Sequence, residues 1–215
     1  MENLTNQQQP YAQNKPLVIA ITGASGVIYG LRLLQYLLAF GQKVEFVISS
    51  AGIRVLQEEH DIILNINDEK INVLKSLKLN CADFNQIQIH KLNDYGASIA
   101  SGSYPTMGMI VIPCSLGTLG ALANGLSQNL IQRAGLVTLK EGRKLLIVLR
   151  EMPFGQIQLK NMLTLSKAGA IISAASPGFY HKPKTIEDQI DFVVGKIIDQ
   201  FDLDNNLFKR WKASL

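Results

Sequence analysis

Short apolar runs alternate with longer amphipathic segments along most of this 215-residue chain. Six compact runs rich in Val, Ile and Leu are typical of strands buried in a parallel sheet, and we predict strands at residues 16–22, 43–49, 86–92, 109–113, 144–149 and 170–173. Apolar residues three or four positions apart predict helices at residues 30–40, 117–124, 127–141, 157–168 and 185–202. This alternation predicts an α/β fold, Rossmann-like or flavodoxin-like, in which a doubly wound and mainly parallel sheet forms a single domain.

The periodic pattern also sets the domain boundaries. It runs over residues 16–203 without an internal repeat or linker, so we assign this stretch to one domain. Residues 1–15 are polar and lack the hydrophobic core of a signal peptide, and we expect them to form a disordered N-terminal tail. Residues 204–215 are expected to form a C-terminal tail.

Composition excludes several classes of function. With 47% hydrophobic and 18% charged residues, the chain is typical of a globular domain. The net charge of +4 is mild and the cations are scattered, so we expect neither nucleic acid nor a membrane as a partner. Cys81 and Cys114 show no metal-binding or redox spacing, which favours a reduced, cytoplasmic setting.

A glycine-rich turn follows the first predicted strand. In the stretch IAITGASGVIYG, residues 19–30, an apolar run ends at Thr22 and four small residues follow it. Such a turn between a strand and a helix directs backbone N–H groups and the positive end of the helix at one point. The turn therefore predicts a phosphate-binding site.

Polar residues also follow the other predicted strands. Ser49 and Ser50 come after the second strand, a segment with Ser115 and Thr118 follows 109–113, and Arg150 with Glu151 follows 144–149. The carboxyl ends of parallel strands meet at one edge of the sheet, where doubly wound folds bind their ligands. We expect these residues to form a polar rim around a phosphate-bearing ligand.

A nicotinamide-dependent reductase is one alternative that this turn suggests. Such an enzyme needs an acid after the second strand to bind the adenosine ribose, and here Ser49 and Ser50 stand there. Its Tyr-x-x-x-Lys pair must lie on one helix, but Pro183 interrupts the pair Tyr180 and Lys184. Both observations weigh against this alternative.

Several longer blocks carry a resemblance to a known family. They are GASG with YGLRLL, PCSLGTLGALANGLSQNLIQRA, LKEGRKLLIVLRE, NMLTLSKAGA, PGFYHKP and DFVVGKIIDQ. In this order, over residues 17–203, they resemble the UbiX-type flavin prenyltransferases. A series of long blocks with matched spacing is far more specific than a single glycine-rich turn.

The resemblance implies an activity and its partners. Enzymes of this family attach a dimethylallyl group from a dimethylallyl phosphate to N5 and C6 of reduced FMN, without a metal ion. The product is the prenylated FMN cofactor of UbiD-type decarboxylases, which act in ubiquinone biosynthesis or aromatic-acid decarboxylation. The resemblance also implies a trimer-based dodecamer with the flavin at a subunit boundary. The apolar segment LGTLGALANGL, residues 116–126, suggests in addition more apolar surface than one small domain readily buries.

Site residues are likewise implied by the resemblance. Those for FMN are Gly23, Ala24, Ser25, Ser49, Ser115, Leu116, Gly117, Thr118, Arg133 and Arg150. Those for the prenyl phosphate are Lys140, Arg150, Tyr180 and Lys196, and those for catalysis are Ser25, Glu59, Lys140 and Glu151. From the residues alone, each serine or threonine could equally be a helix cap, and Arg133 and Lys140 could be helix-surface charges. Lys196 stands among apolar residues of the last predicted helix, an unusual setting for a solvated lysine.

Three positions depart from the family pattern, and two other functions stay open. Gln158 and Lys160 stand where a His and a Glu are common, and Met152 replaces a small residue. A cysteine decarboxylase of the same fold would need a His after the second strand and a Pro-x-Met-Asn motif, and the chain has neither. A non-catalytic FMN carrier would need the serine-rich turns but no cations for a second phosphate.

Overall fold

Six parallel strands form one sheet in the computed structural model, which describes residues 15–79 and 84–211. The spatial order is β3-β2-β1-β4-β5-β6, the order of a doubly wound Rossmann-like sheet. The strands are β1 (Leu17–Ile21), β2 (Val44–Ile48), β3 (Ile87–His90), β4 (Gly108–Cys114), β5 (Lys144–Leu149) and β6 (Ile171–Ala174). The predicted fold class and all six predicted strands are confirmed.

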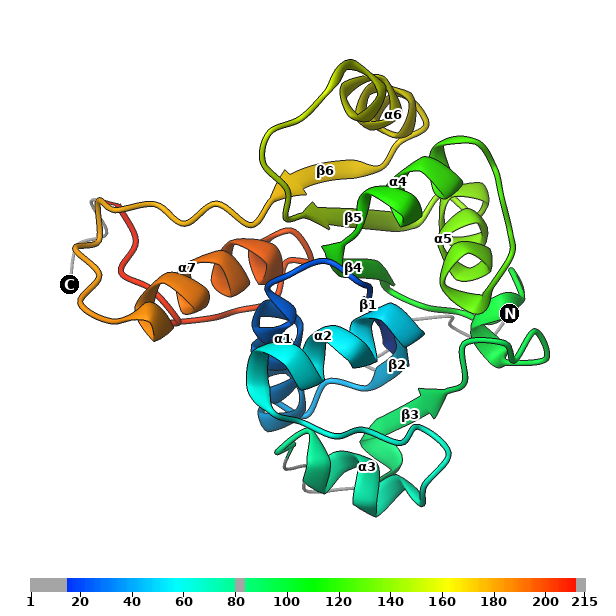
Figure 1. The fold of residues 1–215 in the computed structure, drawn as a ribbon, viewed down its shortest axis with the longest axis horizontal. Coiled ribbons are helices and arrows are strands. Elements are labelled where there is room, and N and C mark those ends of the chain that lie inside the picture. Colours follow the sequence, from blue (N-terminus) through cyan, green and yellow to red (C-terminus); the bar gives the residue numbers. More distant parts are fainter. Residues whose placement is uncertain (1–14, 80–83, 212–215) are drawn as a thin grey trace, which may run out of the picture.

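Helices cover both faces of this sheet. On one face lie α1 (Val27–Ala39), α3 (Lys70–Ser76) and α7 (Ile186–Asp199), whose apolar side chains share a core with Leu17, Ile19 and Ile21 of β1. The opposite face carries α4 (Leu116–Ala123), α5 (Leu130–Lys140) and α6 (Gln156–Lys167), which pack on Val18 and Ala20. Figure 1 shows the two layers on either side of the strands. The alternating side chains of each strand therefore serve two separate cores.

The sequence pattern did not reveal two helices. These are α2 (Ser50–His60), which follows β2 at the carboxyl edge of the sheet, and α3. Only Gly52 and Leu56 of α2 are buried, so its apolar face is too narrow to stand out in the sequence. Two short 3₁₀ turns, η2 (Phe84–Gln86) and η3 (Ser98–Ala100), were also not predicted.

The segment after α7 packs back along that helix. Asn205 donates a hydrogen bond to the backbone oxygen of Gly195, and Phe208 packs on Phe192 with 5.0 Å between the ring centres. Arg210 binds Asp199 through two hydrogen bonds of 2.7 and 2.9 Å. The first part of the expected C-terminal tail, as far as residue 211, is thus fastened to the domain.

Exposed apolar side chains lie elsewhere than the sequence suggested. Within residues 116–126, Leu119 and Leu122 are buried, and Leu126 alone is a large exposed apolar residue. On the same face of the sheet, exposed apolar residues gather instead on α6 and just before it: Met152, Ile157, Leu159 and Leu163. The apolar content of 116–126 is therefore used inside the domain, and the surface argument for assembly moves to α6. None of the described helices is both long and apolar enough to cross a membrane.

Candidate functional site

Hydrogen bonds connect the turns that follow β1, β2 and β4 at the carboxyl edge of the sheet. Ser49 donates its backbone N–H to the oxygen of Ile21 at 3.0 Å, and Ser115 donates its N–H to the hydroxyl of Thr22 at 2.7 Å. The Thr22 hydroxyl in turn donates to the backbone oxygen of Pro113 at 2.8 Å. The order of the strands reverses between β1 and β4, so these turns flank the position at which doubly wound sheets bind ligands.

The turn after β1 is compact because α2 packs directly on it. A Cβ atom on Gly23 would lie 2.3 Å from the Cβ of Ala51, so only glycine fits there. Gly26 has a φ of 92°, in the left-handed region that glycine favours, and opens α1. Ala24 is buried, whereas Ser25 is exposed and its hydroxyl has no hydrogen-bond partner among the residues the structure describes. The small residues therefore serve packing at Gly23 and leave a free hydroxyl at Ser25.

Glu59 and Arg150 both reach this turn from other elements. The two carboxylate oxygens of Glu59, near the end of α2, accept the N–H of Gly26 at 2.9 and 3.1 Å. Arg150, which follows β5, donates from Nε to the backbone oxygen of Ser25 at 3.0 Å. A carboxylate, a hydroxyl and a guanidinium are thus brought to one turn, from residues up to 125 positions apart in the chain. Glu151 follows Arg150 and accepts the N–H of Met152 at 3.1 Å.

Ser49 and Ser115 both act as helix caps. The Ser49 hydroxyl accepts the N–H of Gly52 at 3.0 Å, and the Ser115 hydroxyl accepts the N–H of Thr118 at 3.3 Å. The Ser115 and Thr118 hydroxyls also contact each other at 3.1 Å. The Ser49 hydroxyl, which accepts from the backbone, can still donate its proton outward. The Ser115 hydroxyl already donates to that of Thr118, whose own proton stays available to a ligand.

The N-terminus of α4 is open to an incoming ligand. Gly117 is exposed, and a Cβ atom there would meet no other atom within 4 Å, while Leu116 is half-buried. Together with the beginnings of α1 and α2, this helix end supplies N–H groups and a positive dipole at the same edge. The arrangement fits an anionic ligand. Among the described residues, no group of three or more His, Cys, Asp or Glu side chains could hold a metal ion.

Cys114 lies directly below this edge but takes no part in it. The thiol is fully buried, and burial raises its pKa far above the ordinary value for cysteine. Such a thiol is a small buried side chain and not a nucleophile. Cys81 falls outside the described residues.

Arg133 and Lys140 lie on α5, away from the turn after β1. Arg133 donates from Nε to the backbone oxygen of Ala100 at 3.0 Å. Lys140 is the last residue of α5, is mostly exposed, and forms an ion pair of 3.0 Å with Glu141. Since α5 delivers the chain to the start of β5, Lys140 lies toward the amino edge of the sheet, opposite to Ser25.

Tyr180 and Lys196 belong to a third region, around α7. Tyr180 makes edge-to-face contacts with Phe192 and Trp211, with ring centres 5.6 and 5.4 Å apart. Lys196 lies one turn after Phe192, is exposed, and pairs with Asp199 at 3.9 Å. Tyr180 and Lys196 therefore both lie in the region of α7, and among the described residues neither bonds to Ser25 or Arg150. Figure 1 shows the segment before α7 extending away from the sheet.

All three histidines, which stand alone in the sequence, have close neighbours. Nε2 of His60 lies 3.9 Å from Glu59, and His90 contacts the buried carboxylate of Glu45. The ring of His181 stacks on Phe192 at 4.9 Å. Only the fold could reveal the contacts of His90 and His181, because their partners lie on other elements.

The positions that depart from the family pattern lie at the rim. Met152 is strongly exposed, and Gln158 accepts the N–H of Gly155 at 3.1 Å at the start of α6. Lys160 is exposed on α6. In the part of the chain that the structure describes, none of these three side chains bonds to a residue of the turn after β1.

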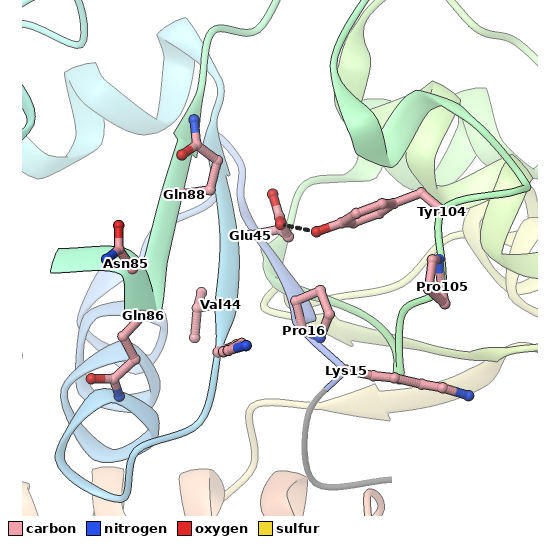
Figure 2. A pocket seen from close by; sticks show the side chains of 10 residues that line it. Lys15, Pro16, Val44, Glu45, Asn85, Gln86, Gln88, Tyr104 and Pro105 are labelled. Carbon is pink, nitrogen blue, oxygen red and sulfur yellow. Dashed lines mark hydrogen bonds between the residues drawn. The ribbon is translucent and has the colours of Figure 1, made fainter. Parts of the chain in front are cut away.

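A separate hollow of about 570 Å³ lies at the amino edge of the sheet (Figure 2). Glu45 lies at its wall, and Figure 2 shows Tyr104 reaching across to its carboxylate. Both oxygens of Glu45 are already bonded, to Tyr104 and His90. The helix N-termini described above lie at the opposite, carboxyl edge of the sheet. Their N–H groups favour that edge as the functional site.

Comparisons with known proteins show the family to which the chain belongs. Residues 5–201 match the model of the Flavoprotein family. The chain is 50% identical over 193 residues to the flavin prenyltransferase UbiX of Halalkalibacterium halodurans, covering 90% of this chain and 91% of the relative. A crystal structure of a UbiX protein in complex with FMN and dimethylallyl pyrophosphate is similar, with a TM-score of 0.81, 36% identity, and coverage of 94% of this chain and 99% of that one. A dodecameric FMN-dependent UbiX-like decarboxylase from Escherichia coli O157:H7 has a TM-score of 0.79 and 36% identity, covering 92% of this chain and 100% of that one.

Proposed function

The chain belongs to the UbiX-type flavin prenyltransferases of the Flavoprotein family, and we propose that it attaches a dimethylallyl group to N5 and C6 of reduced FMN. The donor is a dimethylallyl phosphate. The observation that carries this proposal is the convergence of the free Ser25 hydroxyl, the Glu59 carboxylate and the Arg150 guanidinium on one turn at the ligand-binding edge of the sheet. A relative with the same fold is described as holding both FMN and a dimethylallyl diphosphate.

The carboxyl edge supplies the contacts that FMN requires. We assign its phosphate and polar ring edge to Gly23, Ala24, Ser25, Ser49, and the 115–118 segment of Ser115, Leu116, Gly117 and Thr118, with Arg133 and Arg150 as cations. The open space at Gly117 and the unpartnered hydroxyl of Ser25 support this assignment. When bound and reduced, the flavin supplies the nucleophilic ring atoms that accept the prenyl group.

The prenyl phosphate needs a cationic site of its own. Its C–O bond breaks only where donors already in place stabilise the charge that develops on the leaving phosphate. We assign this role to Lys140, Arg150, Tyr180 and Lys196. Lys140, Tyr180 and Lys196 lie away from Ser25 in one chain, which supports a site completed by neighbouring copies of the chain.

Proton movement falls to the acids near the two ligands. Glu59 is bonded next to Ser25, and we assign this pair to the proton at the flavin. Glu151 follows Arg150 and is assigned to the proton on the leaving phosphate. A carboxylate placed at the reacting group contributes about 10²–10⁴-fold to the rate.

Anaerobic incubation with reduced FMN and a dimethylallyl phosphate tests this function. We expect mass analysis of the extracted flavin to show the addition of one dimethylallyl group with at least one of the monophosphate and the diphosphate donors. The Glu151→Gln variant should bind FMN normally and form this product about 10²–10⁴-fold more slowly. An unchanged flavin with both donors would contradict the proposal and favour a carrier of FMN.

The wider setting of the reaction follows from the same family. We propose that the product passes to a UbiD-type decarboxylase, in ubiquinone biosynthesis or aromatic-acid decarboxylation. We further propose a cytoplasmic, trimer-based dodecamer that acts without a metal ion. The dodecameric relative and the exposed apolar residues of α6 support the assembly.

A further inference from the structure

The end of α2 places a histidine beside the acid that reaches the flavin site. Glu59 accepts the N–H of Gly26 through both of its carboxylate oxygens. Nε2 of the next residue, His60, lies 3.9 Å from Oε2 of Glu59. That nitrogen is buried and has no hydrogen-bond partner among the described residues. A buried polar atom without a partner is costly unless it faces a charge, and Glu59 is the charge that it faces.

The ring of His60 also borders a cavity between α1, α2 and α7. This cavity has a volume of about 490 Å³, and its charged lining residues besides His60 are Arg32, Glu187 and Asp191. Arg32 and Asp191 bind each other with a hydrogen bond of 2.9 Å between Nη2 and Oδ2. Glu187 lies exposed at the start of α7. Arg32 is therefore engaged by Asp191 of α7, and the His60 ring is the donor that faces Glu59 on this side.

The end of the helix places this ring beside partial negative charge. His60 is the last residue of α2, where unpaired carbonyl groups create that charge. An imidazole that carries its proton on Nε2 directs this N–H toward the Glu59 carboxylate at the observed separation.

From this geometry we infer that His60 is a positioning residue for Glu59. It carries a proton on Nε2 and holds the Glu59 carboxylate against the N–H of Gly26, adjacent to Ser25. This inference rests on the proposed function for its consequence in catalysis. The contact between the two side chains does not depend on that function, so it can be tested separately.

Nitrogen NMR of histidine-labelled protein without ligands tests the contact itself. In the Glu59→Gln variant, the ¹⁵N shift of His60 Nε2 should move toward that of an unprotonated nitrogen, because the carboxylate that favours a proton on this nitrogen is gone. Glu58→Gln is the matched control, because Glu58 is exposed on the same helix and pairs with Arg54 at 3.8 Å. It should leave the His60 signal unchanged. An identical His60 signal in wild-type protein and Glu59→Gln would overturn the inference, whatever reaction the protein catalyses.

Kinetics then test the consequence for turnover. We expect His60→Leu to lower kcat for flavin prenylation by up to about 10²-fold, the typical cost of misplacing a reacting group by about 1 Å, with FMN affinity and KM for the prenyl phosphate unchanged. His60→Gln retains a donor and should recover part of the loss. In the Glu59→Gln background, His60→Leu should have no further effect. Equal losses in both backgrounds would show that His60 does not act through Glu59.

Discussion

Glu45 is a carboxylate buried in the middle of the chain's second strand, and two side chains from other segments bind it. The hydroxyl of Tyr104 donates to Oε1 at 2.6 Å, and the His90 ring contacts Oε2. Figure 2 shows the tyrosine approaching from the segment before β4. Burial, and secondly the hydrogen bond to Glu45, raise the pKa of Tyr104 to about 12. The protonated phenol is therefore the form that the folded state stabilises.

This shift predicts how stability depends on alkaline pH. A phenol with a pKa of about 10 when unfolded and about 12 when folded stabilises the protein fully below pH 10. That contribution is lost progressively as pH rises toward 12. We expect Tyr104→Phe to lower the free energy of unfolding by about 1–3 kcal/mol at pH 8, because Glu45 loses a partner while buried.

Urea unfolding at pH 8, 10 and 11 measures this contribution. The difference between wild type and Tyr104→Phe should shrink between pH 10 and 11, whereas Tyr95→Phe, at a half-exposed tyrosine, should behave like wild type throughout. A difference that stays constant up to pH 11 would show that the hydroxyl makes no pH-dependent contribution.

Individual site residues were only partly predictable. Ser25, Ser49, Ser115 and Arg150 were found from the sequence because each follows an apolar strand, and parallel strands end at one edge. The same rule gives no position for a residue inside a helix. Glu59 was therefore implied by resemblance alone, and its bond to Gly26 emerged only from the fold.

At the scale of elements, the contact between α2 and the turn after β1 fixes the site. Gly23 has no side chain because Ala51, in the first turn of α2, occupies that space: an added Cβ would come within 2.3 Å of the Ala51 Cβ. Close packing of this kind sets the distance between Ser25 and Glu59, which belong to the two elements in contact.

A pair of substitutions tests this packing. We expect Gly23→Ala to destabilise the unliganded protein by about 1–3 kcal/mol, because the extra methyl group must push α2 away. Adding Ala51→Gly removes one of the two clashing methyl groups and should recover part of the loss, although glycine near a helix start costs some stability itself. Thermal unfolding of the three variants measures the effect. If the double variant is no more stable than Gly23→Ala alone, the Cβ contact does not determine the fit.

The elements themselves were predictable where they are strongly apolar. All six strands and the helices α1, α4, α5, α6 and α7 were expected near their observed positions, because their apolar residues form compact runs or recur at helical spacing in the sequence. α2 is mostly solvent-exposed and α3 has only seven residues, so neither shows a clear helical spacing of apolar residues in the sequence. The overlooked α2 is the helix that carries Glu59 and His60.

At the scale of the whole molecule, the proposed site residues fall into separate regions of one chain. Ser25, Glu59, Arg150 and Glu151 lie at the carboxyl edge of the sheet, whereas Lys140 ends α5 on the way to the amino edge. Tyr180 lies beyond β6, in the segment that extends away from the sheet in Figure 1. A single chain therefore cannot present all of these groups to one small substrate without a large rearrangement. Assembly resolves this if neighbouring copies contribute the missing cations.

Mixing inactive variants distinguishes a shared site from a site within one chain. Glu59→Gln alters the carboxyl edge and Lys140→Ala alters the end of α5, and each alone should be strongly impaired. If the two residues act from different chains, a site works only where a Lys140→Ala subunit supplies Glu59 and a Glu59→Gln subunit supplies Lys140. Random assembly from equal amounts gives this combination at about a quarter of the sites, so coexpression should restore about a quarter of the wild-type activity. The matched control pairs Glu59→Gln with Glu151→Gln, two changes at the same edge of one chain, and should restore nothing. No recovery in the first mixture would place Lys140 and Glu59 in the same chain's site and contradict the shared arrangement. Recovery in the control would show instead that Glu59 and Glu151 act from different chains.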